Sequence, residues 1–184
     1  MNLDLLDIIG AIRPSEEAVI KSLVSGKAGH CAVLVEVGVW KGHSASLIGE
    51  VVKKKGGYFY CVDHWQGSPG TEMIGEVGKH SIYDVFIHNM GELDLLDYIT
   101  PMKMDSISAS LKFGDGSIDF LFLDADHRYN QFMDDLMGWT PKMKSGGIMC
   151  GHDCEGYYSK MSPAEQERMN KGLDIDFDGN YHCG

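Results

Sequence analysis

Short apolar runs alternate with amphipathic segments along most of the chain. The runs at 31–38, 58–62 and 118–123 are rich in β-branched and aromatic residues, with few polar positions between them. Such runs are typical of parallel strands that are buried on both faces. Between the runs, apolar residues recur at helical spacing, as in the segment 80–91. The alternation of strands and helices predicts a doubly wound α/β fold around a parallel sheet.

Five strands are expected in all. They fall at about 31–38, 58–62, 98–103, 118–123 and 148–151. Residues 3–26 have a helical pattern that Pro14 divides, and proline suits the first position of a helix. Residues 66–79 are rich in glycine and lack a clear period, so they predict a loop, which serves either as a lid or as a surface insertion.

The length and continuity of the chain indicate one domain of 184 residues. We divide it into N-terminal helices over 1–29, a core over 30–155 and a C-terminal segment over 156–184. The last segment shows no sixth or seventh strand. We therefore expect either a fragment of a longer enzyme or a short protein whose fifth strand is an exposed edge. Such an edge can pair with a second copy, so a homo-oligomer is a further hypothesis.

The chain is acidic, with 27 acidic and 16 basic residues and a net charge of −11. This charge repels a nucleic-acid backbone. The basic run Lys53-Lys54-Lys55 needs no partner, because it falls at a predicted helix C-terminus before Gly56. No apolar run approaches a membrane span, and the five cysteines form no regular disulfide framework. We therefore expect a cytoplasmic protein with a small-molecule substrate and no nucleic-acid or membrane partner.

Acidic residues stand where the predicted strands end. Glu36, Asp63 and Asp124 close three of the strands, and Asp105 and Asp153 follow the other two. The carboxyl ends of parallel strands share one rim, and such sheets bind ligands there. Cations or hydroxyl groups would relieve the repulsion between these acids. The alternative is that they cap helices, which is a good account of Asp105 and a weak one of Glu36.

A glycine turn follows the first strand. Gly38 and Gly42 precede an amphipathic helix, and at such turns the backbone can approach a ligand while free N–H groups point outward. The spacing of these two glycines differs from the G-x-G-x-x-G pattern of dinucleotide oxidoreductases, which makes that class the weaker hypothesis.

Four motifs, in this order, resemble those of class I methyltransferases that use S-adenosylmethionine. They are residues 36–44 (EVGVWKGHS), 62–65 (VDHW), 118–129 (IDFLFLDADHRY) and 146–153 (GGIMCGHD). The resemblance extends over about 30–155 and is strongest to the branch of catechol and caffeoyl-coenzyme A O-methyltransferases and macrolide-sugar O-methyltransferases. It implies a Rossmann-like sheet, normally completed by an antiparallel hairpin, and the O-methylation of a small hydroxylated molecule.

The resemblance also implies a set of cofactor-binding positions around the strand ends. They are Glu36, Gly38, Gly42, Ser44, Asp63, Asp105, Ser106 and Asp124. The first three would shape the pocket for the methionine half of the cofactor, and Ser44 would donate to its carboxylate. Asp63 would accept both ribose hydroxyls, which suits a carboxylate. The Asp105–Ser106 pair would face the adenine edge.

Methyl transfer requires a deprotonated nucleophile held in line with the sulfonium. His127 lies three residues after Asp124, where catechol-type enzymes carry a lysine base. Histidine can take a proton at neutral pH. The resemblance therefore makes His127 and Asp124 the catalytic candidates, and the alternative for His127 is a solvent-facing histidine at a helix start.

A divalent cation is a further open question. In the catechol branch it binds the substrate hydroxyls and lowers their pKa. Asp124 and Asp153 match two of the family's acidic ligands, but Cys154 stands where the family has an amide, and thiolate suits magnesium poorly. With His152 or Asp126 as a third ligand, these acids make a candidate magnesium site. The second function hypothesis is a non-catalytic domain that keeps the cofactor cleft.

Overall fold

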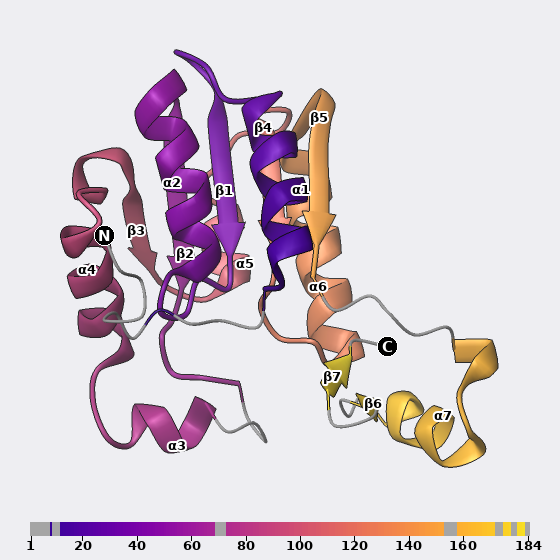
Figure 1. Ribbon diagram of the computed structural model, residues 1–184. Coiled ribbons are helices and arrows are strands. Elements are labelled where there is room, and N and C mark those ends of the chain that lie inside the picture. The colour runs from indigo at the N-terminus through magenta and orange to yellow at the C-terminus, as the bar shows by residue number, and fades with distance from the viewer. Residues whose placement is uncertain are drawn as a thin grey trace.

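A five-stranded parallel sheet runs through the centre of the computed structural model, which describes residues 8, 12–68, 73–152, 158–171, 175–177 and 180–182 (Figure 1). The strands are β1 (Val33–Val37), β2 (Tyr58–Asp63), β3 (Thr100–Lys103), β4 (Ile118–Leu123) and β5 (Met143–Gly151). Their spatial order is β3-β2-β1-β4-β5, and each neighbouring pair is parallel. The predicted doubly wound sheet is therefore confirmed.

Helices cover both faces of the sheet. The front face in Figure 1 carries α1 (Pro14–Ser25), α2 (His43–Lys55) and α4 (Ile82–Glu92), and the back carries α5 (Ser106–Ser110) and α6 (Tyr129–Trp139). Successive strand residues point to opposite faces. Leu34 therefore packs in the core under α1, α2 and α4, whereas Val35 packs in the core under α5 and α6. Burial on both sides explains why the strands are almost continuously apolar.

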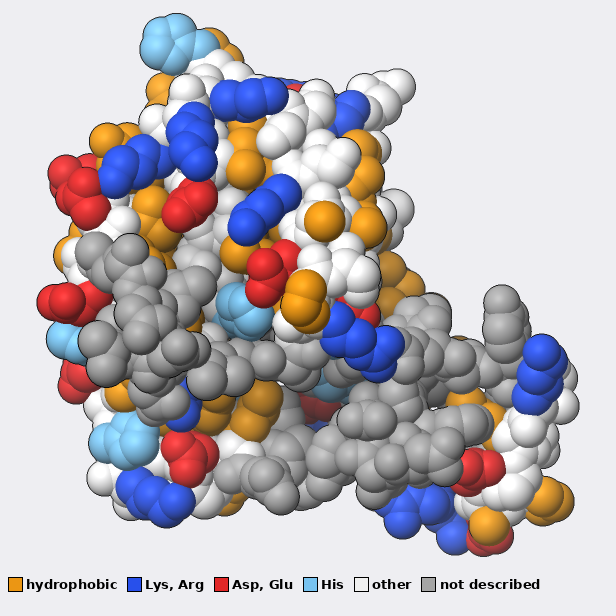
Figure 2. Space-filling model, viewed as in Figure 1, with side chains coloured by type: hydrophobic (Ala, Val, Ile, Leu, Met, Phe, Trp, Pro, Cys, Tyr) orange, Lys and Arg blue, Asp and Glu red, His pale blue; other side chains and the backbone are white. Residues whose placement is uncertain are grey.

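The ends of α1 and α2 follow the predicted signals. Pro14 occupies the first turn of α1, and the Glu16 carboxylate accepts a hydrogen bond from the backbone N–H of Arg13 at 2.7 Å. The Lys53-Lys54-Lys55 run lies in the last turn of α2, before Gly56, whose φ is +84°. Figure 2 shows Lys and Arg side chains gathered around the C-terminal ends of α1 and α2, away from the carboxyl ends of the strands.

Strand β5 is longer than the sequence predicts, because it begins at Met143 and so includes Gly146 and Gly147, which precede the predicted strand at 148–151. Gly146 has a φ of +76°, and the pairing of β4 with β5 shifts its register between Ile118 and Phe120. A Cβ on Gly147 would lie 3.0 Å from the Ile118 carbonyl oxygen. The glycines therefore form an irregularity within the strand, as glycine often does in sheets.

Two further predictions need correction. The segment 66–79 contains a short helix, α3 (Met73–Val77), although its residues 69–72 lie outside the described part of the chain. The C-terminal segment contains α7 (Pro163–Asn170) and also two strands that the sequence did not reveal. β6 (Ile175–Phe177) and β7 (Asn180–His182) form an antiparallel pair that is separate from the main sheet.

In the described part of the chain, short 3-10 helices lie over Leu96–Tyr98, Thr140–Lys142 and Tyr158–Lys160. β5 forms one edge of the five-stranded sheet, where a second copy of the chain can pair with it. That pairing stays a prediction. Within the described residues, none of the helices combines the length and the apolar character that crossing a membrane requires.

Candidate active site

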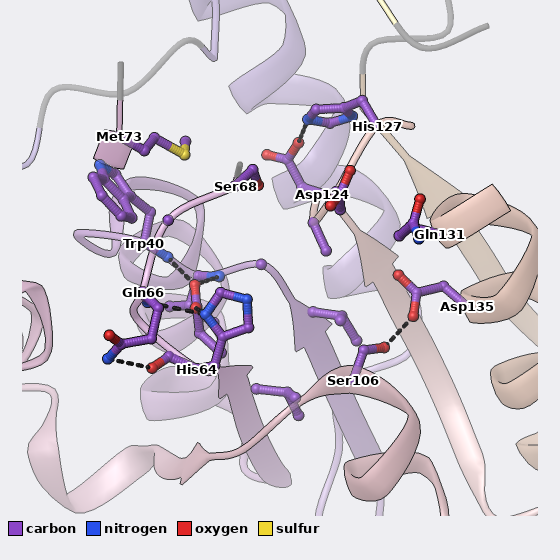
Figure 3. Close-up of a pocket in the computed structure, with 18 of the residues that line it drawn as sticks. Trp40, His64, Gln66, Ser68, Met73, Ser106, Asp124, His127, Gln131 and Asp135 are labelled. Carbon is purple, nitrogen blue, oxygen red and sulfur yellow. Dashed lines mark hydrogen bonds and ion pairs between the residues drawn. The ribbon is translucent and has the colours of Figure 1, made fainter. Parts of the chain in front are cut away.

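A cleft of about 700 Å³ opens at the carboxyl ends of the strands. It lies where the strand order reverses between β1 and β4, which is the usual ligand position in a doubly wound sheet. The loops that follow β1, β2, β3 and β4 all contribute to its walls (Figure 3). The predicted convergence of the strand ends at one rim therefore holds for the loops that carry Asp63, Asp105 and Asp124.

Gly38 brings two of these loops into contact. Its φ is +87°, and a Cβ at this position would lie 2.0 Å from the carbonyl oxygen of Asp124. The Asp124 N–H donates to the Val37 carbonyl at 2.8 Å, and the Gly38 N–H donates to the Val62 carbonyl at 2.9 Å. Gly38 lines the cleft, but glycine is required here by the close approach of the β4 loop.

Gly42 has a different neighbour from the one expected. It is not among the residues that line the cleft, and a Cβ at this position would lie 2.6 Å from Met90 Cε and 3.0 Å from Phe86 Cδ2. Both partners belong to α4. Gly42 therefore allows the start of α2 to pack against α4, and any effect that it has on the pocket is indirect.

Glu36 lies behind the cleft wall and is fully buried. Its Oε1 accepts a hydrogen bond from the Ser44 hydroxyl, and Oε2 has no hydrogen-bond partner among the described residues. Burial raises the pKa of Glu36 well above its usual value; the Ser44 bond opposes the shift, and Asp124 and Asp63 add to it. Ser44 itself does line the cleft, so Glu36 acts as a buried support for a wall residue.

Asp63 ties together the loops that follow β1 and β2. Its Oδ2 accepts from the N–H groups of Val39 at 3.0 Å and Trp40 at 2.8 Å, and its Oδ1 accepts from the Trp65 N–H at 2.6 Å. A carboxylate oxygen can accept more than one bond, so the predicted ribose contact is compatible with these bonds. The two tryptophans differ, since Trp40 lines the cleft and Trp65 is buried beside Phe86.

The loop after β3 is held by α5 and α6. The Asp105 carboxylate caps α5 by accepting from the Ser108 N–H at 2.9 Å. The Ser106 hydroxyl donates to Asp135 and accepts from Trp139 Nε1 at 2.8 Å. Asp105 and Ser106 both line the cleft, but the Ser106 hydroxyl is engaged by the protein interior. If Ser106 contacts an adenine edge as predicted, its hydroxyl has to do so while it bonds to Asp135 and Trp139.

Asp135 is a cleft residue that the sequence analysis missed. Burial raises its pKa to about 6, against the opposing effect of the Ser106 bond and with added repulsion from Asp126 and Asp134. The spacing in the sequence could have indicated that Asp135 is buried. It lies three residues after Phe132 and four before Trp139, which places it on the apolar face of the helix.

The predicted catalytic pair does come together. His127 Nε2 lies 3.7 Å from Asp124 Oδ1, and both residues line the cleft (Figure 3). His152 approaches the same oxygen through Nδ1 at 3.8 Å, and its Nε2 lies 3.2 Å from Glu16 Oε2. The contact with Glu16 was missed, because it joins residues 136 positions apart in sequence. No local pattern could have indicated it.

The candidate magnesium site is only partly described. Asp124 and His152 stand near each other, but Asp153 lies outside the described residues. Asp126, the alternative third ligand, accepts a hydrogen bond from the Arg128 guanidinium at 2.9 Å. Within the described ranges, no three side chains of the types that bind metals come together in a group that could hold an ion. The described donors alone therefore do not fit a magnesium site, and its existence stays a prediction.

A family model described as a methyltransferase domain matches residues 35–154, which run from within β1 to beyond the end of β5 and include every described residue that lines the cleft except Ile8 and Ile12. The chain belongs to this methyltransferase family. The match begins in the strand before Gly38 and includes Asp63, Asp124 and His127. The predicted resemblance to S-adenosylmethionine-dependent methyltransferases is thereby confirmed.

Solved structures share the fold of this methyltransferase domain. An S-adenosylmethionine-dependent O-methyltransferase of Thermotoga maritima has a TM-score of 0.61 at 14% identity, with 93% of this chain and 53% of that protein covered. A caffeoyl-CoA O-methyltransferase-like protein of Staphylococcus aureus has a TM-score of 0.61 at 12% identity, covering 92% of this chain and 74% of its own. The chain thus spans about half the length of the Thermotoga protein.

A third solved structure with this fold is named as a decarboxylase rather than as a methyltransferase. Precorrin 8w decarboxylase of Methanobacterium thermoautotrophicum has a TM-score of 0.57 at 18% identity, with 96% of this chain and 87% of that protein covered. At these low identities the likeness concerns the fold alone, and one fold can serve different reactions. The reaction of this methyltransferase domain has to be argued from its own cleft.

Proposed function

We propose that this methyltransferase domain binds S-adenosylmethionine in the cleft and transfers the methyl group to a hydroxyl oxygen of a small molecule. The observation that carries the proposal is the pairing of His127 with Asp124, 3.7 Å apart, in the same cleft as the carboxylates of Asp63 and Asp105. A histidine next to a carboxylate is a suitable general base for a hydroxyl group.

The cleft has suitable donors and acceptors for each part of the cofactor. Asp63 and Asp105 offer carboxylate oxygens to the ribose hydroxyls and the adenine amine. Ser44 lies in the first turn of α2, where helical N–H groups favour a carboxylate such as that of the methionine half. The raised pKa of Glu36 supports this arrangement, because it weakens the tendency of Glu36 to carry a negative charge behind Ser44.

When bound, the cofactor supplies an electrophilic methyl group on a positively charged sulfur. His127 takes the proton of the acceptor hydroxyl, and the oxygen lone pair forms the new bond to the methyl carbon as the carbon–sulfur bond breaks and its electron pair stays on sulfur. With one ring nitrogen directed at Asp124, the other ring nitrogen is the proton acceptor. The Asp124 carboxylate stabilises the resulting imidazolium.

Calorimetry with S-adenosylmethionine, S-adenosylhomocysteine and NAD tests the cofactor assignment. We expect binding of the first two and none of NAD, and a preference for NAD would overturn the assignment. Cofactor binding without turnover on a panel of phenols and sugars would favour a non-catalytic cofactor-binding domain instead.

Replacing His127 by alanine tests the base. Turnover should fall by about 10²–10⁴-fold, with nearly unchanged affinity for S-adenosylmethionine, because proton transfer is lost while the cofactor contacts remain. The matched control is His88→Ala, which changes an exposed histidine of α4 outside the cleft lining and should keep wild-type turnover. Full activity of the His127→Ala variant would clear His127 of this role.

A further inference from the structure

Helix α1 extends an acidic side chain to a residue of the cleft wall, from outside the segment that matches the family. Glu16 stands in the first turn of α1, and its Oε2 lies 3.2 Å from Nε2 of His152. His152 follows β5, lines the cleft and is only 13% exposed. The start of α1 and the end of β5 are therefore joined at the cleft wall.

His152 connects this contact to the catalytic pair. Its Nδ1 lies 3.8 Å from Asp124 Oδ1, the same oxygen that lies 3.7 Å from His127 Nε2. Each ring nitrogen of His152 therefore faces a carboxylate. Turning the ring would weaken one of these two contacts, so Glu16 and Asp124 together restrict its orientation.

Glu16 is itself held in place by the helix that carries it. Its Oε2 accepts from the Arg13 N–H at 2.7 Å, and its Oε1 lies 3.8 Å from the Arg13 guanidinium, forming the cap of α1. Burial acts to raise the pKa of Glu16, but the Arg13 backbone bond and His152 outweigh it, so the pKa is lowered. Glu16 is thus a fixed negative charge at neutral pH.

The next residue provides a comparison within the same helical turn. Glu17 Oε1 lies 3.0 Å from Nε2 of His43, a cleft residue at the start of α2. Both acids of α1 therefore contact a histidine of the cleft wall. The Glu16 contact continues, through separations of 3.2, 3.8 and 3.7 Å, to His152, to the Asp124 carboxylate and to His127.

We propose that Glu16 is a positioning residue of this active site, which holds His152 against Asp124 and so fixes the carboxylate that faces His127. This inference rests on the proposed function of His127 as the base. It adds to that function a role for α1, which lies before the segment that the family model matches.

Glu16→Gln is the informative variant, because glutamine serves as well as glutamate in a helix cap while it lacks the negative charge. We expect kcat to fall by about tenfold, within the range of one charged hydrogen bond, and KM for S-adenosylmethionine to stay within about twofold. Glu17→Gln removes an equal charge from the same turn and should keep kcat within about twofold. Urea unfolding of both variants controls for loss of folded protein.

A double-mutant cycle distinguishes positioning from a general structural effect. In a His127→Ala background, Glu16→Gln should lower kcat no further, because the group that Glu16 positions is already gone. An equal loss in both backgrounds would overturn the inference. An equal loss of kcat in Glu17→Gln would overturn it as well.

Nitrogen NMR of the imidazole side chains gives a readout that needs no turnover. In Glu16→Gln the signals of His152 and His127 should both shift, whereas Glu17→Gln should shift the signal of His43 alone. A shift of His152 without one of His127 would show that the contact stops short of the catalytic pair and would overturn the inference. If the wild type methylates no acceptor, the proposed function fails while this measurement still decides whether Glu16 positions His127.

Discussion

Replacing Gly38 by alanine should force apart the two loops that build the cleft. The new Cβ would lie 2.0 Å from the Asp124 carbonyl oxygen, 2.4 Å from its carbonyl carbon and 2.6 Å from Ala125 Cα. Non-bonded carbon atoms prefer separations of about 3.5–4.0 Å, so the loops have to move by about 1 Å or more. All three contacts are with backbone, so no side-chain rotation can relieve them.

The expected cost has two parts. An alanine at the φ of +87° observed for Gly38 costs about 1–2 kcal/mol, and overpacking costs typically a further 1–3 kcal/mol. Together they predict a loss of about 2–5 kcal/mol in the free energy of unfolding, or a fall in Tm of roughly 4–20 °C for a chain of this size. Turnover should fall too, because Asp124 moves with its loop.

Gly116→Ala is the matched control. Gly116 also has a positive φ, +62°, but a Cβ there would meet no atom within 4 Å. It should therefore cost only the conformational part, about 1–2 kcal/mol. Urea and thermal unfolding of both variants measure the difference. If Gly38→Ala and Gly116→Ala lose the same stability, the argument from close approach is refuted.

Two further predictions concern side chains around the cleft. Asp135→Asn should gain stability relative to the wild type as the pH rises from about 4 to above 6, because the pKa of Asp135 is raised to about 6 and ionisation of this carboxyl therefore destabilises the folded wild type. Urea midpoints at about pH 4.5 and about pH 7.5 measure the change, and a pH-independent difference between the two proteins would contradict it. Gly42→Ala should cost about 1–3 kcal/mol, less than Gly38→Ala, because its closest contact is the flexible Met90 Cε at 2.6 Å. The double variant with Met90→Leu should lose less than the sum of the two single losses, and strict additivity in urea unfolding would argue against this contact.

The positions of the strands and helices could be predicted because they depend on local patterns. Strands buried on both faces require near-continuous apolar runs, and Pro14 and Gly56 mark helix ends through their own backbone preferences. The short strands β6 and β7 and the helix α3 carried no comparable pattern. The start of β5 was predicted at 148 and lies at Met143, because glycine in a sequence does not show whether a strand includes it as an irregularity.

The sequence by itself determined which residues stand at the strand ends, and a parallel sheet then brings Asp63, Asp105, Asp124 and His127 to one rim. Only the tertiary structure decided what each of them contacts. The burial of Glu36 behind Ser44, the engagement of Ser106 by Asp135 and the approach of Glu16 to His152 all join elements that are distant along the chain. Such contacts depend on how helices pack across the sheet, and a local pattern of polar and apolar residues carries no information about that packing.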